Sequence, residues 1–239
     1  VAGLWSPSTG IIDSHNLMRS LEAKAHGMGV SFAYNHYVTG IEKVSGGYKL
    51  RIKTLDGDDF YLETETVVNS AGLDADTIAS LAGIDIKKAG YEINFVKGHY
   101  FRIKPKLKGL VNHLIYPVPP KKMTFLGIHL TIELDGSMKL GPDIKWMENR
   151  VQDYHVPDNL REKFFVNAEQ YLKGLTIDDI YPDQAGIRPK LQSKEGEFRD
   201  FIINEESEKG LSGFVNLIGI ESPGLTCCLE IGSYVKKLL

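Results

Sequence analysis

The chain has 239 residues, a length between one large domain and two ordinary ones, with 42% hydrophobic residues, 25% charged residues and a net charge of −3. This composition is typical of a globular protein with a substantial core, and the lack of a basic stripe argues against a nucleic-acid partner. No apolar stretch reaches the ~18 residues of a membrane helix, and no signal-peptide pattern is found. The two cysteines, Cys227 and Cys228, are adjacent and would form a strained disulfide, which predicts a reducing, cytoplasmic location.

The first third of the chain predicts a helix, a β-meander and a strand–turn–helix unit. A loop over residues 1–13 precedes a helix that Asp13 or Ser14 caps and that Gly27 or Gly29 ends. Strands are expected at 30–39, 41–45, 48–53, 60–65 and 66–69, with a hairpin turn at Gly46-Gly47 and a helix at 75–82. The last strand, its turn and the helix behind it are typical of an α/β nucleotide-binding sheet.

The middle of the chain predicts a separate antiparallel sheet. Strands are expected at 91–95, 99–103, 113–117, 124–134 and 137–140, followed by a helix at 158–172, a strand at 213–219 and a helix at 225–239. The sequence therefore predicts an α/β domain, part of it at 1–85 and its final strand and helix at 186–239. The α+β antiparallel unit at 86–185 is inserted between these two parts.

Two strand ends could contact a ligand. After the strand at 213–219, the loop Glu221–Gly224 leads into the last helix, and the free N–H groups of Gly224, Leu225 and Thr226 would favour negative charge, such as the pyrimidine edge of a reduced flavin. The segment 68–72 ends in small residues, which allow a dinucleotide to lie across the strand. An ordinary turn between strand and helix explains the same residues, and spacing alone favours it.

Three polar side chains are candidates for chemistry. His129 lies in an otherwise apolar strand, and a neutral imidazole accepts a hydroxyl proton near pH 7, although an isolated strand histidine is more often structural. His99 is a second candidate, which strand alternation could equally turn outward. Arg188, beside Gly186 and Pro189, can hold a carboxylate with two parallel hydrogen bonds, but an interdomain salt bridge or a solvated arginine is as good an explanation. No two histidines have metal-ligand spacing.

Seven segments together resemble the D-amino-acid-oxidase superfamily of flavoproteins, and within it the L-2-hydroxyglutarate dehydrogenase/oxidase group. In chain order they are AGLWSPSTGIID, VVNSAG, KGHYF, LIYPVP, FLGIHLT with DGSMKLGPD, AGIRPKL and NLIGIESPGLT. The resemblance extends over nearly the whole chain. It implies an FAD-binding α/β domain, an antiparallel substrate domain and an active site between them.

The resemblance also implies roles for individual residues. Residues along the adenosine part of FAD would be Val38, Ala71 and Gly72, and residues at the isoalloxazine ring would be Gly219, Ser222, Pro223, Gly224, Leu225 and Thr226. His129 and Arg188 match positions that face the flavin. We therefore expect Arg188 to hold the C1 carboxylate of a small 2-hydroxy acid. We expect His129 to take the hydroxyl proton while the C2 hydrogen leaves as hydride to flavin N5.

Several points stay open at this level. The second carboxylate of 2-hydroxyglutarate could be bound by any of His99, Tyr100, Tyr116 and Lys190. An amine or amino acid is an alternative substrate, and an inactive truncated fragment that serves at most in binding or assembly is a third interpretation. Oxygen, a quinone or a carrier protein could accept the electrons, and a peripheral membrane contact is open, although no amphipathic basic helix favours it.

The sequence departs from the resemblance at its beginning. Related proteins open with a strand, a G-x-G-x-x-G turn and a helix that hold the FAD pyrophosphate, and this chain has no such turn. It opens at Val1 with neither a methionine nor a leading strand. We expect the first βαβ unit to be on another chain, removed by cleavage or missing from this sequence, so FAD binding by the 239 residues alone is in question.

Overall fold

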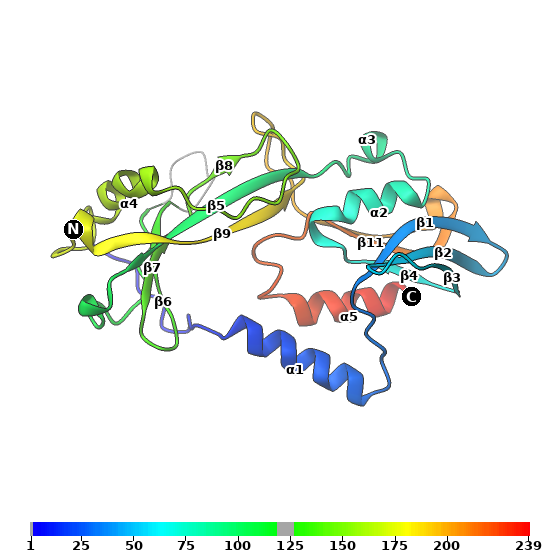
Figure 1. Ribbon diagram of the computed structural model, residues 1–239, viewed down its shortest axis with the longest axis horizontal. Coiled ribbons are helices and arrows are strands. Elements are labelled where there is room, and N and C mark those ends of the chain that lie inside the picture. Colours follow the sequence, from blue (N-terminus) through cyan, green and yellow to red (C-terminus); the bar gives the residue numbers. More distant parts are fainter. Residues whose placement is uncertain (1, 119–126) are drawn as a thin grey trace. The chain divides into compact units, whose positions relative to one another are not determined.

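The computed structural model describes residues 2–118 and 127–239, which form two compact units (Figure 1). Unit 1 contains residues 1–33, 99–143 and 154–185, and unit 2 contains residues 34–98, 144–153 and 186–239. The helices are α1 (Ser14–Gly27), α2 (Ala75–Leu81), α3 (Ile86–Ala89), α4 (Arg161–Ala168) and α5 (Cys228–Leu238). The strands are β1 (His36–Val44), β2 (Gly47–Thr54), β3 (Asp59–Thr64), β4 (Val67–Asn69), β5 (Asn94–Ile103), β6 (His129–Ile132), β7 (Met138–Gly141), β8 (Lys145–Trp146), β9 (Ile180–Lys190), β10 (Ile202–Glu206) and β11 (Leu211–Ile218).

Unit 2 is built on two three-stranded sheets. The first is the predicted meander, with antiparallel order β1-β2-β3, and the second has the order β10-β11-β4, in which β4 and β11 are parallel. Figure 1 shows α2 on one side of the second sheet and α5 on the other. Tyr48 of the meander and Phe214 of β11 are both fully buried and pack edge to face, with ring centroids 5.6 Å apart, so the two sheets share one core.

A buried hydrogen-bond network ties the second sheet together. Glu206, 1% exposed, accepts from Tyr91 and Asn216 at 2.8 Å and from Lys209 at 2.6 Å. Asn216 in turn accepts from Asn69 of β4 at 2.7 Å. A buried carboxylate is tolerated when donors surround it, and here they come from the segment before β5, from β11 and from the turn before β11, while β4 joins the network through Asn216. The network therefore fixes which strands pair.

Unit 1 contains a small antiparallel sheet and one covering helix. Its strands are β6, β7, the second half of β5 and the first half of β9; β6, β7 and β5 follow one another in this order, and β9 also pairs with β5. Phe101, Leu130 and Leu140 point to one face, where they share a core with Phe164 and Ala168 of α4. Residues 1–33, expected with the α/β domain, cluster with this unit instead, and Trp5 packs against the ring of His113 at 4.5 Å.

Most predicted elements are present, with corrections at specific places. The helix at Ser14–Gly27 is capped by Asp13 as predicted, and the hairpin turns at Gly46-Gly47. The predicted strand 30–39 begins only at His36 and continues into 41–45 as β1, and the strands 91–95 and 99–103 form one strand, β5. The predicted strand 113–117 is reduced to a single bridge at Ile115, and β8, β9 and β10 are additional. The predicted strand 124–134 lies partly outside the described residues.

The last helix begins later than predicted. It starts at Cys228 and not at Leu225, because residues 222–227 form a turn. The Cys227 N–H donates to the Pro223 carbonyl at 3.1 Å, a local bond of the turn that precedes the first regular helical residue. Within the described residues, every helix is too short or too polar to cross a bilayer.

Replacing the buried carboxylate of Asp76 tests the packing of unit 2. Asp76 is fully buried, accepts two hydrogen bonds from Arg150 at 2.7 and 2.8 Å, and accepts the Ile93 N–H at 3.0 Å. Asp76→Ala leaves that N–H unsatisfied and should lower the free energy of unfolding by roughly 2–4 kcal/mol in denaturant titrations. The matched control is Asp74→Ala, which removes an exposed carboxylate 3.9 Å from the same arginine and should cost less than about 0.5 kcal/mol. Equal losses in the two variants would contradict this assignment.

Candidate functional site

One face of the unit 1 sheet is polar and the other is apolar. In the register of β5, β6 and β7, Thr131 lies opposite Lys139, and Lys139 lies opposite Arg102. Side chains that are opposite one another in an antiparallel pair point to the same side of the sheet. His129, two residues before Thr131 on the same strand, shares that side. The histidine proposed from sequence as a base therefore lies on the polar face, away from the α4 core.

The ring of His129 contacts Tyr116 and the backbone of Gly127. It stacks on Tyr116, with centroids 4.3 Å apart and 17° between the planes, and its Nδ1 lies 3.3 Å from the Gly127 carbonyl oxygen. Because a carbonyl oxygen only accepts, Nδ1 carries the hydrogen in the neutral ring and Nε2 carries the lone pair. The arrangement is suited to a general base that accepts a proton at Nε2.

Tyr100 and an ion-pair cluster occupy the same polar face. Lys139 Nζ lies 5.5 Å from the centre of the Tyr100 ring and 2.8 Å from Glu133. Arg102 binds Glu133 at 2.7 Å and contacts both oxygens of Asp183 at 3.0 Å. Burial raises the pKa of Glu133, but the hydrogen bonds from Lys139 and Arg102 outweigh it and lower the pKa to about 2. Lys139 was not singled out from the sequence, because only the register shows which face it occupies.

His99 lies on the opposite side of the sheet from these residues. It is 1% exposed, and its backbone N–H and its Nδ1 both lie 2.8 Å from Asp143 Oδ1. Lys163 of α4 binds the other oxygen of Asp143 at 2.6 Å. The structure thus groups His99 with a carboxylate and a lysine of the α4 side, and not with the other substrate-binding candidates Tyr100 and Tyr116.

The part of β9 that belongs to unit 2 carries two cationic side chains, which differ in whether they are already paired with a carboxylate. Lys190 is buried and pairs with Glu221 at 2.6 Å. Arg188 is half-buried, and its side chain has no hydrogen-bond or ion-pair partner in the part of the chain that the structure describes. An arginine has five N–H donors, so Arg188 is the cation of this pair that is available for a carboxylate.

The end of β11 approaches β9 closely. Gly219 has a φ of 72°, and a Cβ at this position would lie 2.7 Å from Leu191 Cγ and 3.3 Å from the Pro189 carbonyl oxygen. Only glycine allows both the positive φ and this approach. Gly219 thus sets the direction in which the chain leaves the sheet toward the turn 222–227.

The turn 222–227 leaves backbone donors without acceptors. The Gly224 N–H, expected to be free, donates to the Glu221 carbonyl. The N–H groups of Leu225 and Thr226 have no acceptor among the described residues. No side chain caps α5, which begins directly after the turn. Two backbone donors and an uncapped helix start therefore form a region of positive potential.

The predicted adenosine-side residues lie on β1 and after β4. Val38 is partly buried and packs on the unit 2 core. Asn69 Oδ1 lies 3.3 Å from the Ala71 nitrogen and holds the turn that follows β4. Gly72 has a φ of 59°, and no other group lies within 4 Å of the position a Cβ would take. The backbone after β4 is therefore open at the glycine that the resemblance places beside the cofactor.

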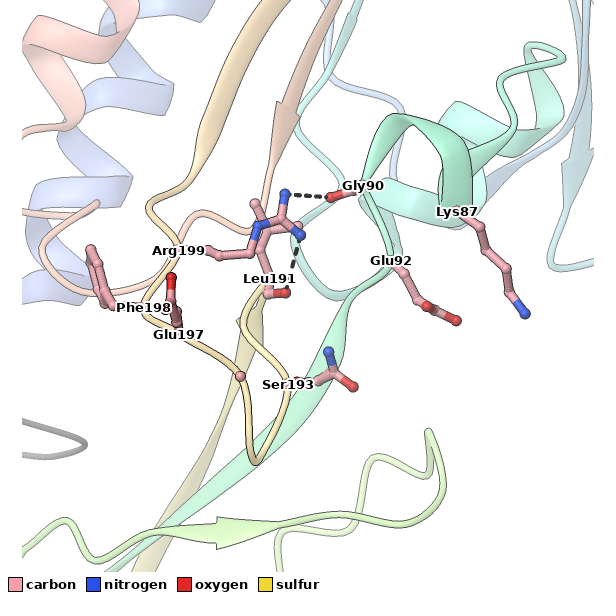
Figure 2. A pocket seen from close by; sticks show the side chains of 10 residues that line it. Lys87, Gly90, Glu92, Leu191, Ser193, Glu197, Phe198 and Arg199 are labelled. Atoms are coloured by element: carbon pink, nitrogen blue, oxygen red, sulfur yellow. Dashed lines mark hydrogen bonds between the residues drawn. The ribbon is translucent and has the colours of Figure 1, made fainter. Parts of the chain in front are cut away.

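A separate cavity of about 490 Å³ in unit 2 lies away from these residues (Figure 2). Arg199 on its wall donates to the Gly90 carbonyl at 2.9 Å and to the Leu191 carbonyl at 3.4 Å. Figure 2 shows the side chains of Lys87 and Glu92 pointing away from that guanidinium. Because the arginine is engaged with backbone oxygens, this cavity offers no convergent set of groups for catalysis.

Comparison with known proteins identifies the family. Residues 1–238 match the DAO family, described as FAD dependent oxidoreductase. The chain belongs to this family. It is 32% identical to the mitochondrial L-2-hydroxyglutarate dehydrogenase of Arabidopsis thaliana, over 99% of this chain and 56% of that protein. It is 33% identical to the protein of the same name from Caenorhabditis elegans, over 98% of this chain and 61% of that protein. The chain thus spans somewhat more than half the length of these relatives.

A solved structure confirms the fold. The dithionite-reduced L-alpha-glycerophosphate oxidase of Mycoplasma pneumoniae, solved with FAD bound, superposes with a TM-score of 0.75 at 23% sequence identity. The match covers 92% of this chain and 54% of that chain. The predicted combination of an α/β FAD-binding-type domain with an antiparallel substrate domain is therefore confirmed as a fold.

Unit 2 fits part of the FAD of a DAO family member. The donors of Leu225 and Thr226 and the start of α5 match the negative charge of a reduced flavin ring, and the open backbone at Gly72 leaves room for the adenosine side. The chain contains no G-x-G-x-x-G turn, so its own residues supply no such cradle for the pyrophosphate. When bound, FAD would supply the hydride acceptor for oxidation of a C–H bond.

The pKa of Asp143 generates a prediction on stability at acid pH. Burial raises this pKa, but the hydrogen bonds from His99 and Lys163 lower it to about 2, below the ordinary value of 3.8. The carboxyl group of Asp143 binds a proton more readily in the unfolded chain than in the folded one. Its contribution to the free energy of unfolding is therefore complete above pH 3.8 and is lost as the pH falls toward 2. Urea titrations across this range should show that Asp143→Asn removes about 2 kcal/mol of the pH dependence. The exposed Asp178→Asn is the control and should keep the wild-type profile; an unchanged profile for Asp143→Asn would refute the assignment.

Proposed function

We propose that the protein of which this chain is part oxidises a small 2-hydroxy acid of the L-2-hydroxyglutarate type to the 2-oxo acid, with FAD as cofactor. The observation that supports this most directly is His129 on the polar face of the unit 1 sheet, where stacking on Tyr116 and the Gly127 carbonyl orient its ring. A positioned imidazole is the group needed to remove a hydroxyl proton. Relatives at 32% and 33% identity are L-2-hydroxyglutarate dehydrogenases.

Each functional group of the chain has one task in this proposal. The Nε2 lone pair of His129 accepts the proton of the C2 hydroxyl, so that the carbonyl forms as the C2 hydrogen departs with its electron pair. For Arg188 of unit 2 the task is to donate two parallel hydrogen bonds to the C1 carboxylate. The N–H groups of Leu225 and Thr226 stabilise the negative charge that the reaction delivers to the cofactor.

An amine or amino acid is the alternative substrate. An amine is oxidised from its neutral form, whose nitrogen lone pair assists departure of the hydride, so that reaction has less need of a strong base. The oriented His129 ring therefore favours a hydroxyl-bearing substrate. Arg188 would hold the carboxylate of either acid and does not discriminate between them.

The flavin absorbance band of the FAD-loaded protein tests the proposed function. L-2-Hydroxyglutarate added without oxygen should bleach the band, and L-glutamate should not. His129→Gln keeps a polar side chain but removes the base, so it should slow bleaching by roughly 10²- to 10⁴-fold while the flavin stays bound. Bleaching by glutamate alone would favour the amino acid reaction, and wild-type rates in His129→Gln would exclude this histidine as the base.

Replacing Arg188 tests the carboxylate-binding role. Arg188→Lys keeps the charge but exchanges a planar two-pronged donor for a point charge. Steady-state kinetics should show KM raised about 10-fold or more, with a smaller effect on kcat, which corresponds to loss of one charge-assisted hydrogen bond. Lys53→Arg, a change between the same two side-chain types at an exposed position of β2, is the control and should leave both constants unchanged. An unaltered KM in Arg188→Lys would remove this residue from the substrate site.

A further inference from the structure

We propose that a cavity on the polar face of unit 1 binds the distal carboxylate of the substrate, with Lys139 as the cation that recognises it. This assignment rests on the proposed function and makes its substrate class specific: a dicarboxylic 2-hydroxy acid rather than a 2-hydroxy acid with an apolar tail. It also selects among the residues that could receive the second carboxylate.

The cavity has a volume of about 460 Å³ and lies within unit 1. One wall is the start of α1, residues 10–15, and the other is formed by β6, β7 and the segment before them. Its polar lining includes Tyr116, Thr131, Lys139 and Gln184, together with two carboxylates, Asp13 and Glu133. This size suits a small organic acid, and the ammonium group and the neutral donors of the lining are the groups that would bind its carboxylate.

Lys139 has hydrogen-bonding capacity to spare. Its side chain is 15% exposed, and its ammonium group donates to Glu133 at 2.8 Å. An ammonium group has three N–H bonds, and no other acceptor for Lys139 occurs among the described residues. The remaining donors border the cavity and are available to a carboxylate.

The two carboxylates that line the cavity, Asp13 and Glu133, are already paired with donors. Glu133 is shared between Lys139 and Arg102, and its lowered pKa reflects these hydrogen bonds. Asp13 accepts the backbone N–H of Asn16 at 2.9 Å and its side-chain amide at 2.7 Å, so both of its oxygens serve the cap of α1. Repulsion of an incoming carboxylate is thereby reduced, because each resident negative charge faces its own donors.

The cavity adjoins the proposed base. Tyr116 lines the cavity and stacks on His129, and Thr131 lies on the same face of β6 as His129, about 7 Å further along the strand. Lys139 is directly opposite Thr131. A substrate whose hydroxyl reaches His129 would therefore extend its short methylene chain toward Lys139.

The other candidates for the distal carboxylate are placed less favourably. His99 lies on the α4 side of the sheet and is bonded to Asp143. Lys190 is paired with Glu221 in unit 2. Among the four residues that the sequence left unranked, Tyr116 is the one that lines this cavity, and Tyr100 lies beneath the Lys139 ammonium. The structure thus assigns the distal carboxylate to Lys139, with the Tyr116 hydroxyl as second donor.

Substrate pairs that differ in the distal carboxylate test the assignment. In the FAD-loaded protein, kcat/KM is measured for L-2-hydroxyglutarate and for L-2-hydroxybutyrate, which lacks that group. Lys139→Met should lower the ratio of the two values roughly 10- to 100-fold, the loss expected for a charge-assisted hydrogen bond. Lys139→Arg should restore most of the ratio. Lys106→Met, which removes a lysine paired with Asp179 elsewhere in unit 1, is the matched control and should leave the ratio unchanged.

A binding measurement with glutarate gives a readout independent of turnover. Glutarate, but not butyrate, should shift the backbone amide NMR signals of Thr131 and Lys139 in the 239-residue chain, and Lys139→Met should abolish the shifts. Tyr116→Phe, which alters no charge, provides a second variant if Lys139→Met does not fold and should weaken glutarate binding. If both hydroxy acids are oxidised and the ratio is the same in Lys139→Met, this proposal is overturned while the proposed function stands. If neither acid is oxidised, the proposed function fails, and the glutarate titration alone decides whether the cavity binds a dicarboxylate.

Discussion

The site in unit 1 depends on strict alternation across three antiparallel strands. Phe101, Leu130 and Leu140 point to α4, so their neighbours in sequence must point away from it. This constraint places the side chains of His129, Lys139 and Arg102 together on the other face, although they come from three different strands. A shift of one residue in the pairing would exchange the two faces, because strand side chains alternate with a period of two. The packing of the apolar face against α4 therefore also positions the polar groups.

Much of the fold is predictable from local sequence patterns. The α1 cap at Asp13, the glycine turn of the first hairpin and the strand–turn–helix after Thr66 depend on neighbouring residues, and the structure contains all three. The strands β9 and β10 were missed because their patterns are irregular: β9 contains Pro182 and Gly186. The start of α5 was misplaced because Pro223 is compatible both with a first helical turn and with the tight turn that forms.

The site was less predictable, because its residues meet only through strand register. His129 could be named from its apolar surroundings, but the side of the sheet it occupies depends on pairing with β7. His99 has the same chemical character, yet it points to the α4 side and is bonded to Asp143, a partner 44 residues away. Nothing in the local sequence distinguishes Lys139 from an ordinary strand lysine, because its importance depends on its position opposite Thr131. The sequence shows which side chains are chemically suitable, whereas the fold shows which of them lie together.

The parallel pairing of β4 with β11 has a consequence for biosynthesis. Val67 of β4 pairs with Phe214 of β11, so β4 waits for a strand that is made about 147 residues later. Asn69 likewise finds its partner Asn216 only then. A ribosome adding about 5–20 residues each second leaves β4 without this neighbour for many seconds. Unit 2 therefore completes its second sheet only after β11 has been made, and a contiguous stretch that lacks either β4 or β11 cannot reproduce that sheet.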